Sequence, residues 1–138
     1  RVLDAAFTDA QDRLELDLAA AYRVPALTAL VRTFTHDRTV RAITVSDEVR
    51  FSTPQTFSVP IITYRDVTRK DDTALYLHDK QRCVEVKIAA EGGAWRLEEE
   101  RLENPGKASP RRLAVTFDAP VTSARVRVTL SPVPDFKP

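Results

Sequence analysis

The sequence has few of the residues from which disulfide frameworks, zinc sites and phosphate loops are built. Its 138 residues include one cysteine, two histidines, three glycines and no methionine. A single cysteine excludes an internal disulfide, and one cysteine with two histidines is too few for a Cys/His zinc site. Three glycines, two of them adjacent at Gly92 and Gly93, exclude a glycine-rich phosphate loop. We therefore expect no metal and no cofactor.

The sequence also has no large excess of basic or acidic residues and no long apolar run. The 21 basic residues offset 20 acidic ones and leave a net charge of +1, whereas a general nucleic-acid binder carries a large basic excess. No apolar run approaches the ~20 residues of a membrane-spanning helix. We expect neither nucleic acid nor membrane as a partner. Hydrophobic residues make up 43% of the chain, which is enough for a packed core.

What recurs along the chain is strict alternation of apolar and polar residues, the pattern of a half-buried β-strand. Turn signals such as Ser52–Pro54 and Lys70–Asp72 separate the alternating segments. The pattern predicts an all-β fold, an antiparallel β-sandwich of roughly eight to ten short strands. Residues 18–22 form the only helical candidate, of about one turn. The alternating apolar residues are Leu14, Leu16 and Leu18; Leu30 and Phe34; Ile43, Val45, Val49 and Phe51; Leu75 and Leu77; Val84, Val86 and Ile88; Leu113, Val115 and Phe117; Val126, Val128 and Leu130.

Both ends of the chain have the character of a cut. It begins at Arg1 in strand-like sequence and ends in the proline-rich segment Ser131–Pro138, which cannot continue a sheet. We see no internal boundary, repeat or low-complexity block. We expect residues 1–138 to be a single β-sandwich domain, excised from the C-terminal part of a larger protein.

Two charged residues occupy apolar positions of the alternating pattern. Arg32 shares a face with Leu30 and Phe34, and Asp47 shares a face with Val45 and Val49. A lone charge on a buried face costs several kcal/mol. If the two strands pair, Arg32 and Asp47 form a structural ion pair. The alternative is a β-bulge that turns Asp47 to solvent.

Candidate catalytic side chains are few, and we assign none. His36 precedes Asp37 and His78 precedes Asp79, but neighbours on a strand point to opposite faces, so neither histidine is oriented by the aspartate beside it. Cys83 begins a strand and has only Arg82 beside it, so we interpret it as a small packing residue.

Basic residues gather over the last strands. Arg125 and Arg127 share one face, opposite Val126 and Val128, and Arg112 joins them on that outer surface if its strand pairs there. Arginine binds planar anions in a bidentate manner. Arg112, Arg125 and Arg127 are therefore candidate ligands for sulfate or uronate groups of an anionic polysaccharide. The alternative is an ordinary solvated surface, neutralised by the acidic run Glu98–Glu100.

Three segments carry a resemblance to a known family. Leu30–Arg38 has the form L-x-R-x-F-x-x-D-R, Ala42–Phe51 is close to L-T-V-T-D-E-F-x-F, and Phe57–Thr63 ends in I-I-T. Together with Asp17–Tyr22, they resemble the C-terminal β-sandwich region of heparinase II/III-like polysaccharide lyases over residues 10–65. His36 departs from the aromatic residue that the family has there. The matching residues are Arg32, Phe34, Asp37, Arg38, Val45, Asp47, Glu48 and Phe51.

The resemblance implies a larger protein in which an N-terminal (α/α) toroid joins antiparallel β-sheets. Such lyases cleave uronic-acid polysaccharides by β-elimination. Their catalytic Asn and Tyr come from the toroid, and a further His comes from a glycine- and histidine-rich segment early in the β region. This chain contains none of these motifs. The missing toroid is therefore the expected partner, and the parent is expected to be periplasmic or extracellular.

Three functions remain open from the sequence. The chain is the non-catalytic part of a lyase and supports the toroid, or it is a stand-alone carbohydrate-binding module for anionic polysaccharide, or it is a purely structural interface domain. The binding module predicts an arginine-lined groove or an exposed aromatic platform. The interface domain predicts an exposed apolar patch where the toroid docks.

Overall fold

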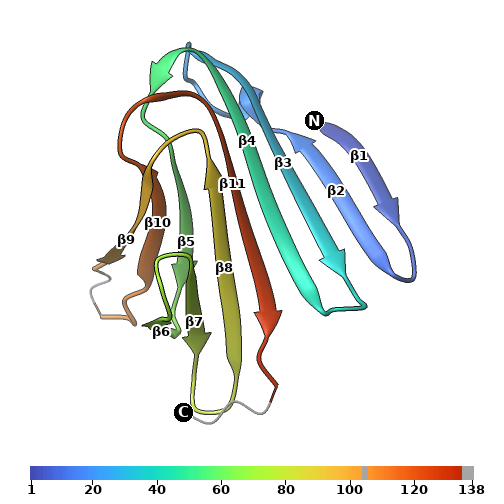
Figure 1. Cartoon of the computed structure of the whole chain (residues 1–138), viewed down its shortest axis with the longest axis vertical. Coiled ribbons are helices and arrows are strands. Elements are labelled where there is room, and N and C mark those ends of the chain that lie inside the picture. The colour runs from blue at the N-terminus through green and yellow to red at the C-terminus, as the bar shows by residue number, and fades with distance from the viewer. Residues whose placement is uncertain (104–105, 135–138) are drawn as a thin grey trace.

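The computed structural model describes residues 1–103 and 106–134 and shows two antiparallel β-sheets (Figure 1). The elements are β1 (Val2–Phe7), β2 (Gln11–Asp17), η1 (Ala19–Ala21), β3 (Leu27–Asp37), β4 (Ala42–Gln55), β5 (Ser58–Thr63), β6 (Asp66–Arg69), β7 (Ala74–His78), β8 (Cys83–Glu91), β9 (Trp95–Arg101), β10 (Arg111–Phe117) and β11 (Val121–Pro132). Ser131 and Pro132 of the proline-rich tail continue β11 and pair with β8, so the expectation that this segment cannot continue a sheet is wrong at its start. Residues 135–138 lie outside the described part.

The predicted all-β antiparallel sandwich is confirmed, with eleven strands in the described part of the chain rather than eight to ten. The large sheet has the order β1-β2-β3-β4-β11-β8-β7-β6, and the small sheet has the order β5-β10-β9. The helical candidate at residues 18–22 is the single 3-10 turn η1, as expected. No helix in the described residues is long and apolar enough to cross a membrane.

The core lies between the small sheet and the part of the large sheet formed by β4, β11, β8 and β7. Cross-strand pairs such as Val45 with Val128, and Val128 with Ile88, place apolar side chains of neighbouring strands on one inner face. Leu113 and Val115 of the small sheet complete this core and are fully buried. Burial of a residue of this size contributes about 1.5–3 kcal/mol.

The two sheets differ in width. Figure 1 shows the small sheet beside β8 and β7, while β1, β2 and β3 extend away from it on the other side. Inner-face residues at that end are therefore exposed: Phe7 is 70% exposed and Ile43 is 48% exposed.

A glycine pair carries the chain from one sheet to the other. Gly92 and Gly93 lie between β8 of the large sheet and β9 of the small sheet. Gly92 has φ +119° and packs directly on the backbone of β11, where an added Cβ would lie 2.5 Å from the Ser123 carbonyl oxygen. Only glycine adopts this conformation at low cost.

Candidate functional site

A concave groove runs across the outer face of the large sheet, over β2, β3, β4 and β11. It has a volume of about 650 Å³. We call it the outer groove. Its charged lining residues are Arg13, Glu15, Glu48, Arg50, Arg125 and Arg127, and its hydroxyl residues are Thr33, Thr35, Thr44 and Ser46, with Ala29 and Val31 between them.

Strand register explains how these side chains come together. Thr33 lies opposite Ser46, which in turn lies opposite Arg127 on β11. Directly cross-strand residues share a face of the sheet. The hydroxyl residues of β3 and β4 therefore form the centre of the groove, and Arg127 lies at their β11 side. The next outward residue of β11, Arg125, lies opposite Glu48.

The arginines of the groove differ in their partners. Arg125 Nη2 donates to Glu48 Oε2 at 2.8 Å, and Arg50 Nη2 lies 3.2 Å from Glu48 Oε1. The hydrogen bond from Arg125 lowers the pKa of the Glu48 carboxyl, and Glu48 in return raises the pKa of Arg125. Arg13 pairs with Asp4 and Glu15.

Arg127 makes no ion pair with any residue in the described part of the chain. It is exposed, and the lining as a whole has four arginines against two glutamates, an excess of two positive charges. Arg127 is therefore the guanidinium in the groove that is most available to an external anion.

Arg112 does not belong to this surface, so the expectation that it joins Arg125 and Arg127 is wrong. Its strand, β10, pairs with β5 and β9 in the small sheet and not with β11. Because Leu113 and Val115 point into the core, Arg112 points away from it, on the opposite face of the sandwich. There Arg112 Nη1 lies 3.6 Å from Glu100 Oε2.

Arg32 and Asp47 lie directly opposite each other on β3 and β4. Arg32 Nε donates to Asp47 Oδ1 at 2.6 Å, and Nη2 donates to Oδ2 at 2.7 Å. Asp47 is 2% exposed, while the Arg32 side chain is 31% exposed. The pair is therefore bidentate, with its carboxylate buried and its guanidinium reaching solvent.

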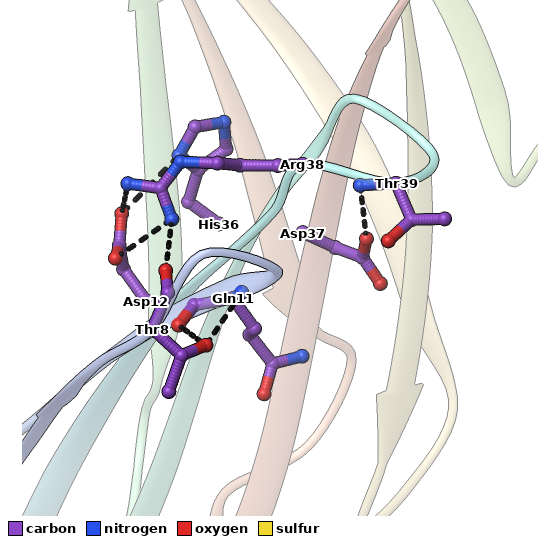
Figure 2. Close-up of polar contacts among 7 residues, drawn as sticks. All are labelled: Thr8, Gln11, Asp12, His36, Asp37, Arg38 and Thr39. Atoms are coloured by element: carbon purple, nitrogen blue, oxygen red, sulfur yellow. Dashed lines mark hydrogen bonds and ion pairs between the residues drawn. The ribbon is translucent and has the colours of Figure 1, made fainter.

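A third polar cluster joins the β1–β2 turn to the end of β3, and Figure 2 shows its members. Arg38 donates to both carboxylate oxygens of Asp12, at 2.9 and 2.6 Å, and to the Thr8 carbonyl oxygen at 2.8 Å. His36 Nδ1 lies 3.5 Å from Asp12 Oδ2. Asp37 points the other way and accepts from the Thr39 backbone N–H (Figure 2).

Sequence reasoning missed Asp12, because its partners are more than twenty residues away. The signal that could have found it is the β2–β3 register, which places Asp12 opposite His36. The His36–Asp37 dipeptide is separated across the two faces of β3, as the alternation requires. The cluster connects the β1–β2 turn to the β3–β4 turn through Thr8, Asp12 and Arg38.

The remaining sequence candidates lie apart from the outer groove. Cys83 is buried, and burial raises the pKa of its thiol, so little thiolate is present at neutral pH. His78 Nε2 lies 2.9 Å from the Thr68 hydroxyl. Within the described residues no three His, Cys, Asp or Glu side chains are grouped so that they could hold a metal ion.

The Asp12 cluster leads to a prediction about acid stability. The hydrogen bond from Arg38 is the largest cause that lowers the pKa of Asp12. A carboxyl whose pKa is depressed in the folded state stabilises the fold above its unfolded pKa of about 3.9, and this stability is lost as the pH falls through the folded value. Asp12→Asn should therefore be less stable than the parent chain at neutral pH, and the gap should close in acid. Urea unfolding at several pH values measures it, with Asp9→Asn as the control. A gap that is unchanged in acid would contradict the assignment.

Comparisons with known proteins are consistent with the fold. The chain is similar to the solved structure of heparinase III, the BT4657 gene product, with a TM-score of 0.78 and 9% sequence identity. It also matches the form of that protein with methylated lysines, with a TM-score of 0.66 and 12% identity. In both, 96% of this chain aligns and spans 21% of the other chain. No protein-family model and no curated protein matches the sequence. The heparinase-like fold that the sequence segments predicted is confirmed.

Proposed function

We propose that this chain is the non-catalytic β-sandwich region of a heparinase II/III-like polysaccharide lyase, in which it supports a catalytic (α/α) toroid. The observation that carries the proposal is the uncovered inner face of the large sheet at β1, β2 and β3. The parent enzyme would cleave uronic-acid polysaccharides by β-elimination. Since long polysaccharides do not enter the cytoplasm whole, the parent would be periplasmic or extracellular.

The uncovered surface carries apolar side chains on either side of the Asp12–His36 contact. Phe7 lies opposite Asp12, Asp12 opposite His36, and His36 opposite Ile43, so Phe7 and Ile43 share one row of the inner face. Leu14 and Phe34 form the next row. We call Phe7, Leu14, Phe34 and Ile43 the open inner face. Phe7 and Ile43 are exposed, Leu14 and Phe34 are half-buried, and all four line one shallow hollow. Exposed apolar residues gathered in this way mark an interaction site.

The comparison with heparinase III supports a partner within the same polypeptide. This chain spans 21% of that protein, so a parent of similar length would have ample chain to cover the open inner face. The chemistry of the outer groove also fits a supporting role. β-Elimination needs a base near the C5 proton and a group that stabilises the resulting negative charge. Both glutamates of the groove are held in ion pairs, Glu15 with Arg13 and Glu48 with Arg125, and the lowered pKa of Glu48 weakens it as a base.

The test is hydrogen exchange on this chain alone and on the same chain joined to the toroid. We expect the amides of β2 and β3 to exchange more slowly in the joined protein, because the toroid covers the open inner face. Phe7→Ser with Ile43→Thr should abolish this protection. Tyr64→Ser with Ile62→Thr is the matched control, since both residues are exposed but Ile62 lies in β5 of the small sheet and Tyr64 just after it.

An activity measurement completes the test. The chain alone should give no unsaturated uronide, detected by ultraviolet absorbance, from heparan sulfate, hyaluronan or alginate. Product formation by the chain alone would overturn the non-catalytic role. Equal exchange with and without the toroid would overturn the docking role.

Arg127 favours a second candidate function, a carbohydrate-binding module for anionic polysaccharide. An unpaired guanidinium next to a row of hydroxyl side chains can bind sulfate or carboxylate and sugar hydroxyls together. In this function the outer groove acts alone and requires no toroid.

Two arginines on opposite faces make this second candidate testable. Arg127→Ala should weaken binding of the chain to immobilised heparin by roughly two- to five-fold in Kd, the effect of losing one exposed ion pair. Arg112→Ala should leave Kd unchanged, because Arg112 lies on the other side of the sandwich. Surface plasmon resonance on immobilised heparin at a fixed salt concentration measures both Kd values. Equal losses in the two variants would indicate nonspecific charge attraction.

A further inference from the structure

A second cavity, separate from the outer groove, opens on the inner side of the large sheet. It has a volume of about 370 Å³ and lies between β3, β4 and the start of β5. Among the described residues β5 is an edge strand that pairs with β10 alone, so the small sheet ends here and leaves the space open. We call it the inner pocket. Its volume is that of a site for a small molecule.

The Arg32–Asp47 pair forms the polar part of this pocket. Asp47 uses both carboxylate oxygens to accept from Arg32 Nε and Nη2. Arg32 Nη1 makes no hydrogen bond to any residue in the described ranges, and it is not among buried polar atoms that lack a partner. Nη1 is therefore accessible to solvent, on a residue that lines the pocket.

The other walls are mainly apolar. Leu30, Val49 and Val59 are buried lining residues from three different strands. Phe51 and Phe57 add aromatic surface and contact each other edge to face, with ring centroids 6.3 Å apart. The exposed Tyr22 forms part of the lining from the segment after η1.

An ion pair with a buried carboxylate is a costly way to stabilise a strand pair. Well-packed apolar residues of similar volume usually serve stability as well or better. The pair therefore needs another role, and its position on an otherwise apolar pocket supplies one. Because Asp47 already neutralises the guanidinium, the pocket offers hydrogen-bond donors without a net positive charge.

We propose that the inner pocket binds an uncharged ligand group, an apolar ring or short chain that carries a carbonyl or hydroxyl oxygen. The oxygen accepts from Arg32 Nη1, and the apolar part contacts Leu30, Val49 and the aromatic walls. An anion is disfavoured, because it would enter an apolar site whose only strong charge is already neutralised. This inference does not depend on the proposed function.

Cyclohexanone is a suitable probe, because it combines a six-membered apolar ring with a neutral acceptor. In NMR titrations of the methyl-labelled chain, it should shift the signals of Leu30, Val49 and Val59 in a saturable manner, with Kd of about 1–10 mM. Cyclohexanecarboxylate should bind about ten-fold more weakly. Absence of saturable shifts at these methyls would overturn the proposal, and so would equal binding of the carboxylate.

Two variants identify the groups that bind the probe. Tyr22→Ala removes an exposed wall and should weaken cyclohexanone binding by about five-fold, whereas Tyr64→Ala, an exposed tyrosine outside the pocket lining, should not change it. Arg32→Met with Asp47→Leu replaces the polar pair at similar volume and should abolish preference for the ketone over methylcyclohexane. Retained preference in this double variant would show that Arg32 is not the donor. Should the double variant not fold, equal affinities in Tyr22→Ala and Tyr64→Ala would overturn the site by themselves.

Discussion

Gly92→Ala should lower the midpoint of thermal unfolding by about 10 °C, the equivalent of about 3 kcal/mol for a chain of this length. The new Cβ would lie 2.5 Å from the Ser123 carbonyl oxygen and 2.9 Å from Ala124 Cα. Both are backbone atoms of β11, so they cannot move aside as a flexible side chain would. The φ of +119° adds strain of its own for any L-residue.

The other two glycines of the chain provide the controls. Gly93→Ala places its Cβ in ordinary contact with Phe117 and Val121, at 3.7 and 3.8 Å, and should change the midpoint by less than about 2 °C. Gly106 has φ +75° but open space around it. Gly106→Ala therefore isolates the backbone cost of a positive φ, about 1 kcal/mol. If Gly92→Ala and Gly106→Ala lower the midpoint of thermal unfolding by the same amount, the contact with β11 contributes nothing to the loss. Calorimetry or thermal circular dichroism measures all three.

Arg32→Met should destabilise the chain by about 3–5 kcal/mol, because it leaves the Asp47 carboxylate buried without a partner. Asp47→Asn should cost less, about 1–2 kcal/mol, since Arg32 is 31% exposed and can turn its charge to water. The expected asymmetry follows from the unequal burial of the two groups. Urea unfolding at neutral pH measures both free energies.

The double variant separates the pair from its surroundings. Arg32→Met with Asp47→Leu removes both charges and should lie within about 1 kcal/mol of the parent chain. A double variant that is as unstable as Arg32→Met alone would mean that packing, not the unpaired charge, causes the loss. Equal losses for the two single variants would contradict the assigned burial.

Alternation predicted the strands that have one buried face, and it failed where that condition is not met. β5 has apolar residues on both faces, with Ile62 exposed and Val59 buried, so no period of two is visible. β6 has only four residues and a single apolar one, Val67. Both strands form because neighbouring strands supply hydrogen bonds, which the local sequence does not reveal.

The candidate sites show where the limit of such reasoning lies. The Arg32–Asp47 contact spans a hairpin, so two adjacent alternating segments are enough to bring the residues opposite each other. To decide whether Arg112 and Arg125 share a surface, one must know which sheet each of their strands joins. Alternation separates inside from outside but does not distinguish one outer face from the other. The outer groove and inner pocket depend on that assignment, and neither could be predicted as a cavity.

The position of β11 has a consequence for the order of folding. It is the last of the strands in chain order, yet it lies in the middle of the large sheet, between β4 and β8. In the described residues no other strand joins the β1–β4 half to the β6–β8 half. Early hairpins can form during synthesis, but the two halves unite only when residues 121–132 are available. A chain that stops before residue 121 would hold two unpaired sheet edges where the native protein has its central strand, and such edges promote aggregation.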